Sequence, residues 1–281
     1  MSGVLQLESG PAAIAPAKFS VRELVKTRTR GAGAGGGESF VAVDHVSFDV
    51  KAGEFLCLLG PSGCGKTSIL NILAGLDVPT DGTALLDGRP ITGPGPDRAV
   101  LFQEPALFPW LSVAGNVELA LRLIGVPESE RRDRAMRWLE NVHLGRFADA
   151  QPHELSAGMR QRAALARALA AEPDVLLGDE PFGSLDAQAR ELLQDEVQRV
   201  WAEREGMATF VFVTHNVREA ALLADRVLVM SAAPGRLLEE VRISSPRPRA
   251  LDDVLVSRVV SEIHELLMQE VDKGVAREMG R

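Results

Sequence analysis

The sequence has few cysteines, no excess of positive charge and no long apolar segment. Its 2 cysteines, Cys57 and Cys64, are too few for a disulfide framework or a zinc site. The net charge of −8 argues against general binding of nucleic acid, which usually needs a basic excess. We find no apolar run that could cross a bilayer and no signal-peptide pattern. If the protein works at a membrane, we therefore expect a partner to hold it there.

What is present is typical of a globular α/β protein of 281 residues, with 46% hydrophobic and 25% charged residues. Residues 1–18 are rich in Ala, Pro, Gly and Ser, and we expect a flexible tail there. The glycine run 31–37 lacks the preceding strand and following helix of a dinucleotide-binding loop, so it predicts a loop between two strands.

One glycine-rich stretch, Gly60 to Ser68, has the pattern of a phosphate-binding loop. The apolar run 55–59 before it predicts a buried strand, and 68–75 predicts the start of a helix, which is the context that this motif needs. Backbone N–H groups of such a loop point at an anion, Lys66 adds a full charge, and the Thr67 hydroxyl can bind Mg²⁺. The residues expected to hold the nucleotide are Gly60, Pro61, Ser62, Gly63, Cys64, Gly65, Lys66, Thr67 and Ser68.

The remaining pattern alternates buried strands with amphipathic helices, which indicates an α/β fold with a largely parallel sheet. Strands are predicted at 19–25, 40–50, 83–86, 99–102, 175–180, 208–214, 226–230 and 237–243. Residues from about 104 to 172 look like a helical insertion between strands. Residues 246–249 look like a linker, and 247–281 is assigned as a helical tail that packs on the main domain or, alternatively, contacts a partner.

Three polar positions lie at the ends of predicted strands, where α/β sheets bind ligands. Asp179 can orient Mg²⁺, and Glu180 can polarise an attacking water as a general base. Gln103 can bind Mg²⁺ through its amide oxygen, and His215 can contact a γ-phosphate and hold the base in line. Taken singly, each has a plain alternative: a solvated acidic turn, a loop glutamine and a structural histidine.

Together these motifs resemble the ATP-binding cassette (ABC) family over residues 19–246. The run from Leu155 to Arg162 resembles the family's signature motif, Ser184–Asp186 its D-loop, Gln103 its Q-loop and His215 its switch. The resemblance implies a cassette fold with an N-terminal antiparallel β subdomain, a parallel-sheet core and an inserted helical subdomain. It also implies ATP as ligand, Mg²⁺ as metal and an adenine-stacking aromatic at Phe40.

The resemblance implies a site built from two cassettes that sandwich two ATP molecules head to tail, so that the phosphate-binding loop of one faces the signature motif of the other. This chain has one such loop and one signature motif, so the resemblance implies a second copy or a homologue as partner. Residues of the second cassette that would contact the nucleotide correspond to Ser156, Ala157, Gly158 and Asp186. Ala157 stands where the family usually has glycine, and its methyl group could crowd the phosphate or restrict the backbone.

Within the family, the stretches 100–111, 179–186 and 213–220 are similar to nitrate, sulfonate and taurine importers. This implies membrane permease subunits that contact about Gln103–Trp110, and an extracytoplasmic solute-binding protein as an indirect partner. It also implies a peripheral position on the cytoplasmic face of the inner membrane. The apolar loop 104–110 suits such docking, although burial within the helical insertion is the alternative.

Three other functions remain open at this point. A soluble ABC ATPase usually carries long coiled coils or two cassettes, which this chain lacks. A non-hydrolysing regulatory cassette would fit Ala157 but not the presence of both Glu180 and His215. A small-molecule kinase would need an acceptor site, and nothing in the sequence resembles one. The transported solute cannot be read from this chain.

Overall fold

A computed structural model describes residues 17–30, 38–203 and 208–279 of the chain. Most of the expected tail and all of the glycine run 31–37 lie outside these ranges. Ala17 and Lys18, which we assigned to the tail, instead begin the first strand. Lys18 Nζ forms ion pairs with Asp87 at 2.8 Å and Asp174 at 3.2 Å, and these contacts fix the start of the strand.

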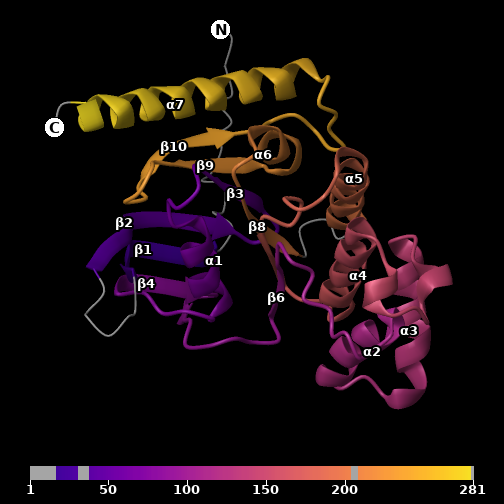
Figure 1. Cartoon of the computed structure of the whole chain (residues 1–281). Coiled ribbons are helices and arrows are strands. Elements are labelled where there is room, and N and C mark those ends of the chain that lie inside the picture. The colour runs from indigo at the N-terminus through magenta and orange to yellow at the C-terminus, as the bar shows by residue number, and fades with distance from the viewer. Residues whose placement is uncertain (1–16, 31–37, 204–207, 280–281) are drawn as a thin grey trace, which may run out of the picture.

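The first sheet is antiparallel and is formed by the N-terminal part of the chain (Figure 1). Its strands, in the order β2-β1-β4-β5, are β2 (Glu38–Lys51), β1 (Ala17–Arg30), β4 (Asp81–Leu86) and β5 (Arg89–Pro90). β1 and β2 extend beyond the predicted strands because backbone pairing continues to Arg30 and Glu38, through polar residues that the hydrophobic pattern does not mark.

The second sheet holds the ends of the strands on which the candidate site was predicted. Its order is β10 (Leu237–Arg242), β9 (Arg226–Met230), β3 (Phe55–Leu59), β8 (Thr209–Thr214), β7 (Val175–Asp179) and β6 (Arg98–Leu101). β10 is antiparallel to β9, and the other neighbours are parallel. The carboxyl ends of β3, β7 and β8 therefore meet at one edge.

Some of the helices lie against the second sheet, and others form a separate helical region (Figure 1). The helices are α1 (Lys66–Ala74), α2 (Val113–Leu123), α3 (Glu128–Asn141), α4 (Ala157–Ala170), α5 (Ala187–Glu203), α6 (Val217–Leu223) and α7 (Val254–Met279). α2 and α3 form a helical region with α4, at the opposite side of the molecule from the antiparallel sheet. The two short 3₁₀ turns Gly145–Phe147 and Pro152–Glu154 also belong to this inserted region. The predicted cassette architecture is confirmed.

The core lies on both faces of the second sheet, because side chains alternate along each strand. In β3, Leu56 and Leu58 face α1 and the antiparallel sheet, whereas Phe55, Cys57 and Leu59 face the other helices. All five residues of β3 are buried, as expected for a central parallel strand. The strand that leads into the glycine loop is thus fixed from both sides.

The predicted linker 246–249 is packed against the domain. The Arg249 side chain is 1% exposed, and its guanidinium donates to Ala224 O at 2.5 Å and to Ser245 O at 2.8 Å. Arg247 bonds the carbonyl of Leu223 and lies 4.0 Å over the Trp201 ring. These contacts tie the start of the C-terminal segment to the end of α6.

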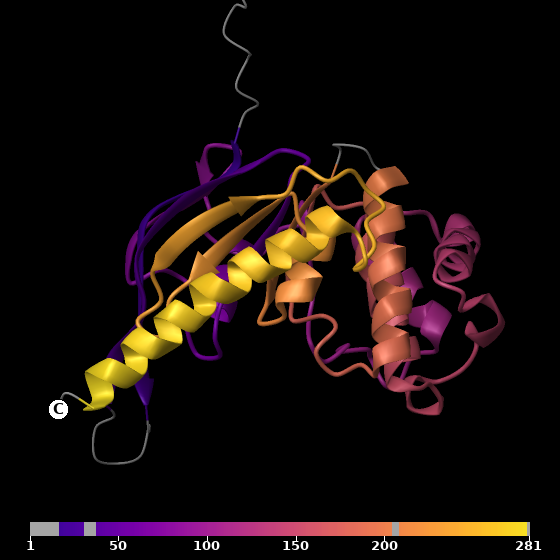
Figure 2. The same ribbon diagram turned by 90° about the horizontal axis from the view of Figure 1, so that it is seen from above.

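α7 runs over β9, β10 and α6, as Figure 2 shows from above. Val256 and Ile263 on α7 are buried. Val259, Leu266 and Leu267 pack against the hydrophobic core that includes Ile263 and Phe55 of β3. Packing on the main domain is therefore the observed arrangement for this part of the tail. Among the described residues, no helix combines the length and apolar character that crossing a membrane requires.

One buried carboxylate in the scaffold makes stability depend on pH. Glu196 on α5 is 5% exposed, and its Oε2 atom accepts no hydrogen bond from the described residues. Burial raises the pKa of Glu196 to about 7, against the opposing effect of Arg162 and Arg199. A raised carboxyl pKa in the folded state means that stability is lost as the pH rises from the unfolded value, 4.5, toward 7.

We therefore expect Glu196→Gln to raise the melting temperature by a few degrees at pH 8, where the native carboxyl must be ionised. The gain should shrink as the pH is lowered to 5, because the carboxyl is then protonated in the folded protein. Thermal unfolding followed at several pH values measures this. Glu239→Gln, an exposed change on β10, is the control. A difference between the Glu196→Gln variant and wild type that does not vary with pH contradicts the expectation.

Candidate nucleotide-binding and hydrolysis site

The glycine loop connects the end of β3 to the start of α1, as the sequence predicted. Gly65 caps α1 with φ of 91°. A Cβ atom there would lie 2.5 Å from Cγ2 of Val43 and 2.8 Å from the Ala42 carbonyl oxygen. Only glycine satisfies both the backbone conformation and this close approach. The first turn of α1 therefore directs its free N–H groups into the loop.

Lys66 is held inside the loop by backbone carbonyls. Its Nζ donates to Gly60 O at 2.7 Å and to Pro61 O at 3.0 Å, and the residue is 4% exposed. The Cys64 thiol lies beside it, with Sγ 3.8 Å from Nζ, and burial raises the pKa of that thiol. The ammonium group is thus placed at the centre of the loop, where a phosphate would need a cation.

A hairpin from the far end of the chain supports the loop from behind. Gly235, between β9 and β10, donates to Ala42 O and accepts from the Asp44 N–H, each at 2.9 Å. A Cβ atom on Gly235 would lie 1.9 Å from the carbonyl oxygen of Cys64, that is, inside the loop backbone. Glycine is required here for close approach, and nothing in the sequence pattern indicates this contact.

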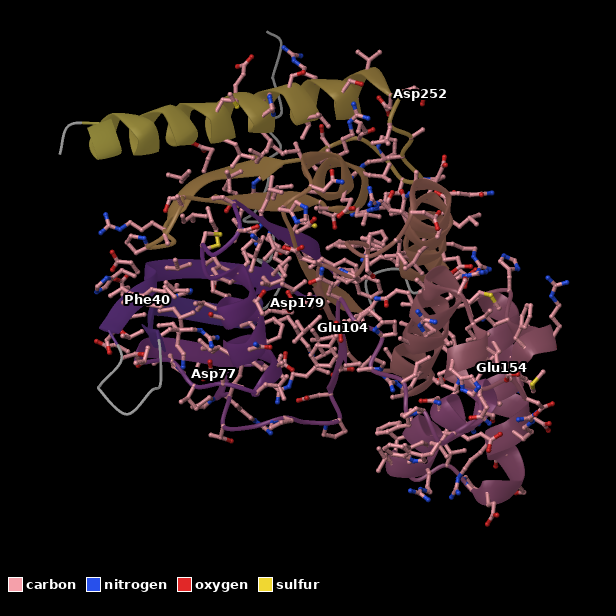
Figure 3. The ribbon with its side chains drawn as sticks, viewed as in Figure 1. Phe40, Asp77, Glu104, Glu154, Asp179 and Asp252 are labelled. Carbon is pink, nitrogen blue, oxygen red and sulfur yellow. The ribbon has the colours of Figure 1, made fainter. Side chains whose placement is uncertain are left out.

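A pocket of about 470 Å³ opens over the loop. Its lining residues are Arg28, Phe40, Ala42, Ser62, Gly63, Gly65, Lys66, Thr67, Ser68, Asn71 and Glu180. Figure 3 shows Phe40 in the antiparallel sheet and Asp179 in the middle of the molecule. Phe40 and Glu180 thus line one pocket with the glycine loop, although they are far apart in sequence.

Three lining residues, Arg28, Ala42 and Asn71, were not singled out from the sequence. Arg28 lies on β1, and its Nε donates to Ser68 Oγ at 3.1 Å. Its guanidinium adds a second positive charge to the pocket that Lys66 also lines. Nothing in the local pattern around Arg28 marks it, because its position depends on how the fold brings β1 to α1.

Thr67 and Asp179 are in direct contact. Thr67 Oγ1 donates to Asp179 Oδ1 at 2.9 Å. Burial raises the pKa of the Asp179 carboxyl, and the hydrogen bond from Thr67 acts against that shift. A hydroxyl and a carboxylate oxygen at one point form a donor set that suits Mg²⁺, which prefers oxygen ligands.

Glu180 and His215 also meet. His215 Nδ1 lies 2.9 Å from Glu180 Oε2, and the glutamate is the less exposed of the two. Glu180 adopts φ of 44°, a left-handed conformation that costs free energy in a residue other than glycine. Its N–H donates to Val213 O at 3.0 Å, which holds this turn against β8. In this conformation Glu180 lines the pocket over the glycine loop.

Gln103 lies beside the loop that follows Glu180. It lies exposed after β6, and its Nε2 would be 3.2 Å from a Cβ on Gly183. Its carbonyl accepts a bond from Ser184 Oγ at 3.4 Å. Gln103 therefore contacts the loop that follows Glu180, whereas no described contact joins it to the candidate metal residues.

The signature residues lie at the exposed start of α4, outside the pocket lining. Ser156 caps this helix, since its Oγ accepts from the Met159 N–H at 3.3 Å. Gly158 is buried, and a Cβ there would lie 2.8 Å from Cβ of Ala189 on α5, whereas Ala157 is exposed. The departure from the family pattern thus falls at the outward-facing position. Asp186 accepts from the Ala189 N–H at 2.9 Å and so caps α5.

The loop 104–111 is exposed at its tip but is held firmly. The Trp110 residue is 73% exposed. The buried Asn116 side chain accepts from the Phe108 N–H at 2.8 Å and donates to Leu111 O at 3.3 Å. Arg167 donates to Ala106 O at 2.8 Å. Burial of the whole loop within the helical region, the alternative, is not observed.

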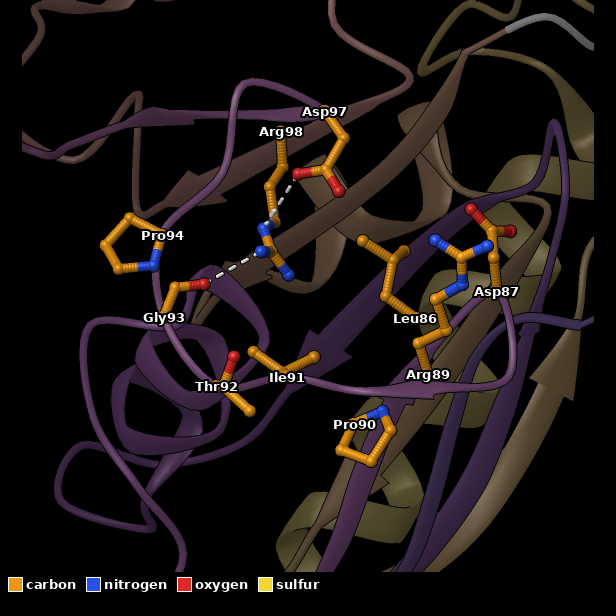
Figure 4. A pocket seen from close by; sticks show the side chains of 10 residues that line it. All are labelled: Leu86, Asp87, Arg89, Pro90, Ile91, Thr92, Gly93, Pro94, Asp97 and Arg98. Atoms are coloured by element: carbon orange, nitrogen blue, oxygen red, sulfur yellow. Dashed lines mark hydrogen bonds and ion pairs between the residues drawn. The ribbon is translucent and has the colours of Figure 1, made fainter.

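A second pocket, of about 480 Å³, lies at the other end of α1 (Figure 4). Arg98 in its wall donates to Gly93 O at 2.8 Å and to Leu73 O at 3.3 Å, and its Nε lies 3.2 Å from Asp97 Oδ1. These bonds hold the C-terminal end of α1, so this arginine has a structural task. The phosphate-binding end of α1 faces away from this pocket.

A strand, a glycine loop with a buried lysine, and a helix, together with acidic residues at the end of a second parallel strand of the same sheet, define the class of P-loop nucleotide-binding proteins. Comparison with known proteins then specifies the family. Residues 43–183 match the profile described as ABC transporter. The chain belongs to the ABC transporter family, and it is an ATP-binding ATPase.

Two curated relatives and one solved structure illustrate the similarity. The taurine import ATP-binding protein of Mesorhizobium japonicum is 52% identical over 72% of this chain and 78% of its own. The nitrate import ATP-binding protein of a Synechocystis strain is 45% identical over 74% and 77%. A dimeric ATP-binding cassette in a post-hydrolysis state, bound to ADP and Pi, aligns with a TM-score of 0.70 and 31% identity, over 81% of this chain and 100% of that chain.

Proposed function

We propose that this ATPase powers an importer of small anions such as nitrate or sulfonates. The relatives named for nitrate and taurine import support the transport role and the class of solute. The observation that carries hydrolysis is the contact of Glu180 with His215 at 2.9 Å, in a pocket that Glu180 shares with Lys66. A regulatory cassette that only binds ATP would not need this pair.

Mg²⁺ is proposed as the metal, held by Thr67 Oγ1 and Asp179. The donor set fits, since both groups are oxygen ligands and already lie 2.9 Å apart. When bound, the metal would supply positive charge to the phosphate oxygens. No hydrogen bond among the described residues joins Gln103 to either group, so its metal-binding role stays a prediction.

In the proposed reaction the glycine-loop N–H groups and Lys66 bind the β- and γ-phosphates. Glu180 accepts the proton of an attacking water as general base. His215 donates a hydrogen bond to the γ-phosphate and holds Glu180 through the bond between them. Phe40 lines the far side of the pocket and can stack on the adenine ring.

Completion of the site requires a second cassette, which we propose to be another copy of this chain. Ser156 and Gly158 lie at the N-terminus of α4, where free N–H groups and a hydroxyl could grip a γ-phosphate presented from outside. Ala157 is exposed there, so its methyl would face the incoming nucleotide. Asp186 is proposed to lie at the same interface.

The proposed permease contact is the loop from Gln103 to Trp110. The adjoining groove of about 530 Å³ includes Trp110, Leu119 and Arg122, and offers an apolar ring beside charged groups. A helix end of a membrane subunit suits such a groove. This contact would hold the protein at the cytoplasmic face of the inner membrane, and a solute-binding protein would act from the other side.

Trp110→Ala should separate ATP hydrolysis from transport. Trp110 lies outside the nucleotide pocket, so we expect the purified cassette to hydrolyse ATP within about twofold of wild type. Uptake by the complete transporter in proteoliposomes should fall about tenfold or more, because the complex would lose an aromatic side chain that the permease buries. Measuring phosphate release and solute uptake on the same preparation tests this.

Leu123→Ala is the matched control, because Leu123 is 77% exposed on the same helical region but lies outside the groove lining. It should change neither activity. Equal loss of uptake in both variants would argue against a docking role specific to Trp110.

The proposed solute class is tested by offering taurine, nitrate and an uncharged amino acid to the reconstituted transporter. Uptake of the uncharged amino acid alone would contradict the proposed class.

A further inference from the structure

A buried carboxylate lies between the two loops that carry Glu180 and His215. Glu219, on α6, is 6% exposed. The two loops follow β7 and β8, which are adjacent parallel strands. Their ends must be kept at a fixed separation if Glu180 and His215 are to remain 2.9 Å apart.

On one side, Glu219 bonds the residues that flank His215. Thr214 Oγ1 donates to Glu219 Oε2 at 2.7 Å, and Asn216 Nδ2 donates to Oε1 at 3.3 Å. The Thr214 hydroxyl also accepts from the Asn216 N–H at 3.0 Å. The residues on both sides of His215 are therefore bonded to one side chain.

On the other side, Glu219 pairs with a cation that holds the loop after Glu180. Arg190 Nε lies 3.6 Å from Glu219 Oε1, an ion-pair distance longer than a hydrogen bond. Arg190 Nη2 donates to Leu185 O at 3.0 Å. Leu185 belongs to the segment that runs from Glu180 into α5. The link thus runs from the His215 loop through Glu219 and Arg190 to the Glu180 loop.

We propose that Glu219 and Arg190 are positioning residues that set the distance between Glu180 and His215. The inference rests on the catalytic roles proposed above for those two residues. Asn216 Oδ1 already caps α6 by accepting from the Arg218 N–H at 3.0 Å, so the contacts of Glu219 with Thr214 and Arg190 are additional to that cap. Burial raises the pKa of Glu219, and the bond from Thr214 and the charge of Arg190 oppose that shift. The buried charge is costly, and the bonds it makes go to the loops of the site.

The test compares Glu219→Gln with Glu196→Gln in the otherwise unchanged protein. Both changes replace a buried carboxyl group by an amide of the same shape, but Glu196 contacts neither loop. We expect Glu219→Gln to lower kcat about tenfold, because a small displacement of the reacting groups is costly. ATP affinity, measured with a fluorescent nucleotide, should stay within about twofold. Glu196→Gln should leave both within about twofold, and Arg190→Met should resemble Glu219→Gln.

A combination with His215→Ala distinguishes positioning from general weakening. If Glu219 acts through His215, adding Glu219→Gln to His215→Ala should cost less than about twofold further. A further tenfold loss in that background would overturn the inference. So would an unchanged kcat in Glu219→Gln when His215→Ala is inactive. Full activity of His215→Ala is a different failure, since it would remove the proposed role of His215 itself.

Discussion

Glu180→Gln is expected to lower the rate of ATP hydrolysis about 1,000-fold while leaving ATP binding intact. The glutamine keeps the shape of the side chain and can still bond His215, but it cannot accept a proton from water. The groups that bind phosphate, the loop N–H groups and Lys66, are unchanged. Phosphate release measures the rate, and a fluorescent nucleotide measures binding.

The same variant should accumulate as an ATP-bound dimer, because the γ-phosphate that would join two cassettes is not removed. Size-exclusion chromatography with light scattering, with and without ATP and Mg²⁺, detects this. Glu239→Gln, a like change on the exposed face of β10, should behave as wild type. Unchanged steady-state hydrolysis in Glu180→Gln would remove the assignment of the general base.

Lys66→Met should have the opposite signature, a loss of binding. Lys66 is the buried cation of the loop, held by the carbonyls of Gly60 and Pro61. Removing a charged contact to phosphate is expected to weaken ATP affinity about 100-fold. Fluorescent-nucleotide titration measures the loss, and thermal unfolding shows whether the fold is retained.

Lys26→Met is the matched control for that change. Lys26 is another lysine near α1 and is half-buried, but its Nζ donates to Asp77 at 2.6 Å and it lies outside the pocket lining. We expect it to cost some stability and to leave ATP affinity within about twofold. Similar affinity losses in the two variants would mean that Lys66 acts only through the fold.

The local features of this protein could be predicted because they depend on short stretches of sequence. Glycine at Gly65, the apolar run of β3 and the spacing to Lys66 fix the loop without reference to the rest of the chain. The acids at the end of β7 and the histidine after β8 follow the general rule for ligand sites in parallel sheets. The α/β cassette fold, the family and the ATPase activity were all predicted correctly.

Several contacts between distant segments could not be predicted. Gly235 approaches the carbonyl of Cys64 from near the other end of the chain, and only the folded hairpin reveals why glycine stands there. Arg28 reaches Ser68 because the fold packs the antiparallel sheet against α1. Glu219 looks like an ordinary helix residue until Thr214 and Arg190 are seen beside it. For Gln103 the pattern is recognisable, but no hydrogen bond among the described residues joins it to Thr67 or Asp179, so its metal-binding role stays a prediction.

The buried anchor at Arg249 has a practical consequence for protein engineering. Its guanidinium occupies carbonyl groups at the end of α6, so a shortened gene that stops before codon 249 would leave Ala224 and Ser245 without their donors. A reporter domain or affinity tag is better joined beyond α7, where the fusion leaves this anchor intact. The choice of cloning boundary thus decides whether α6, which is capped by the residue after His215, keeps its support.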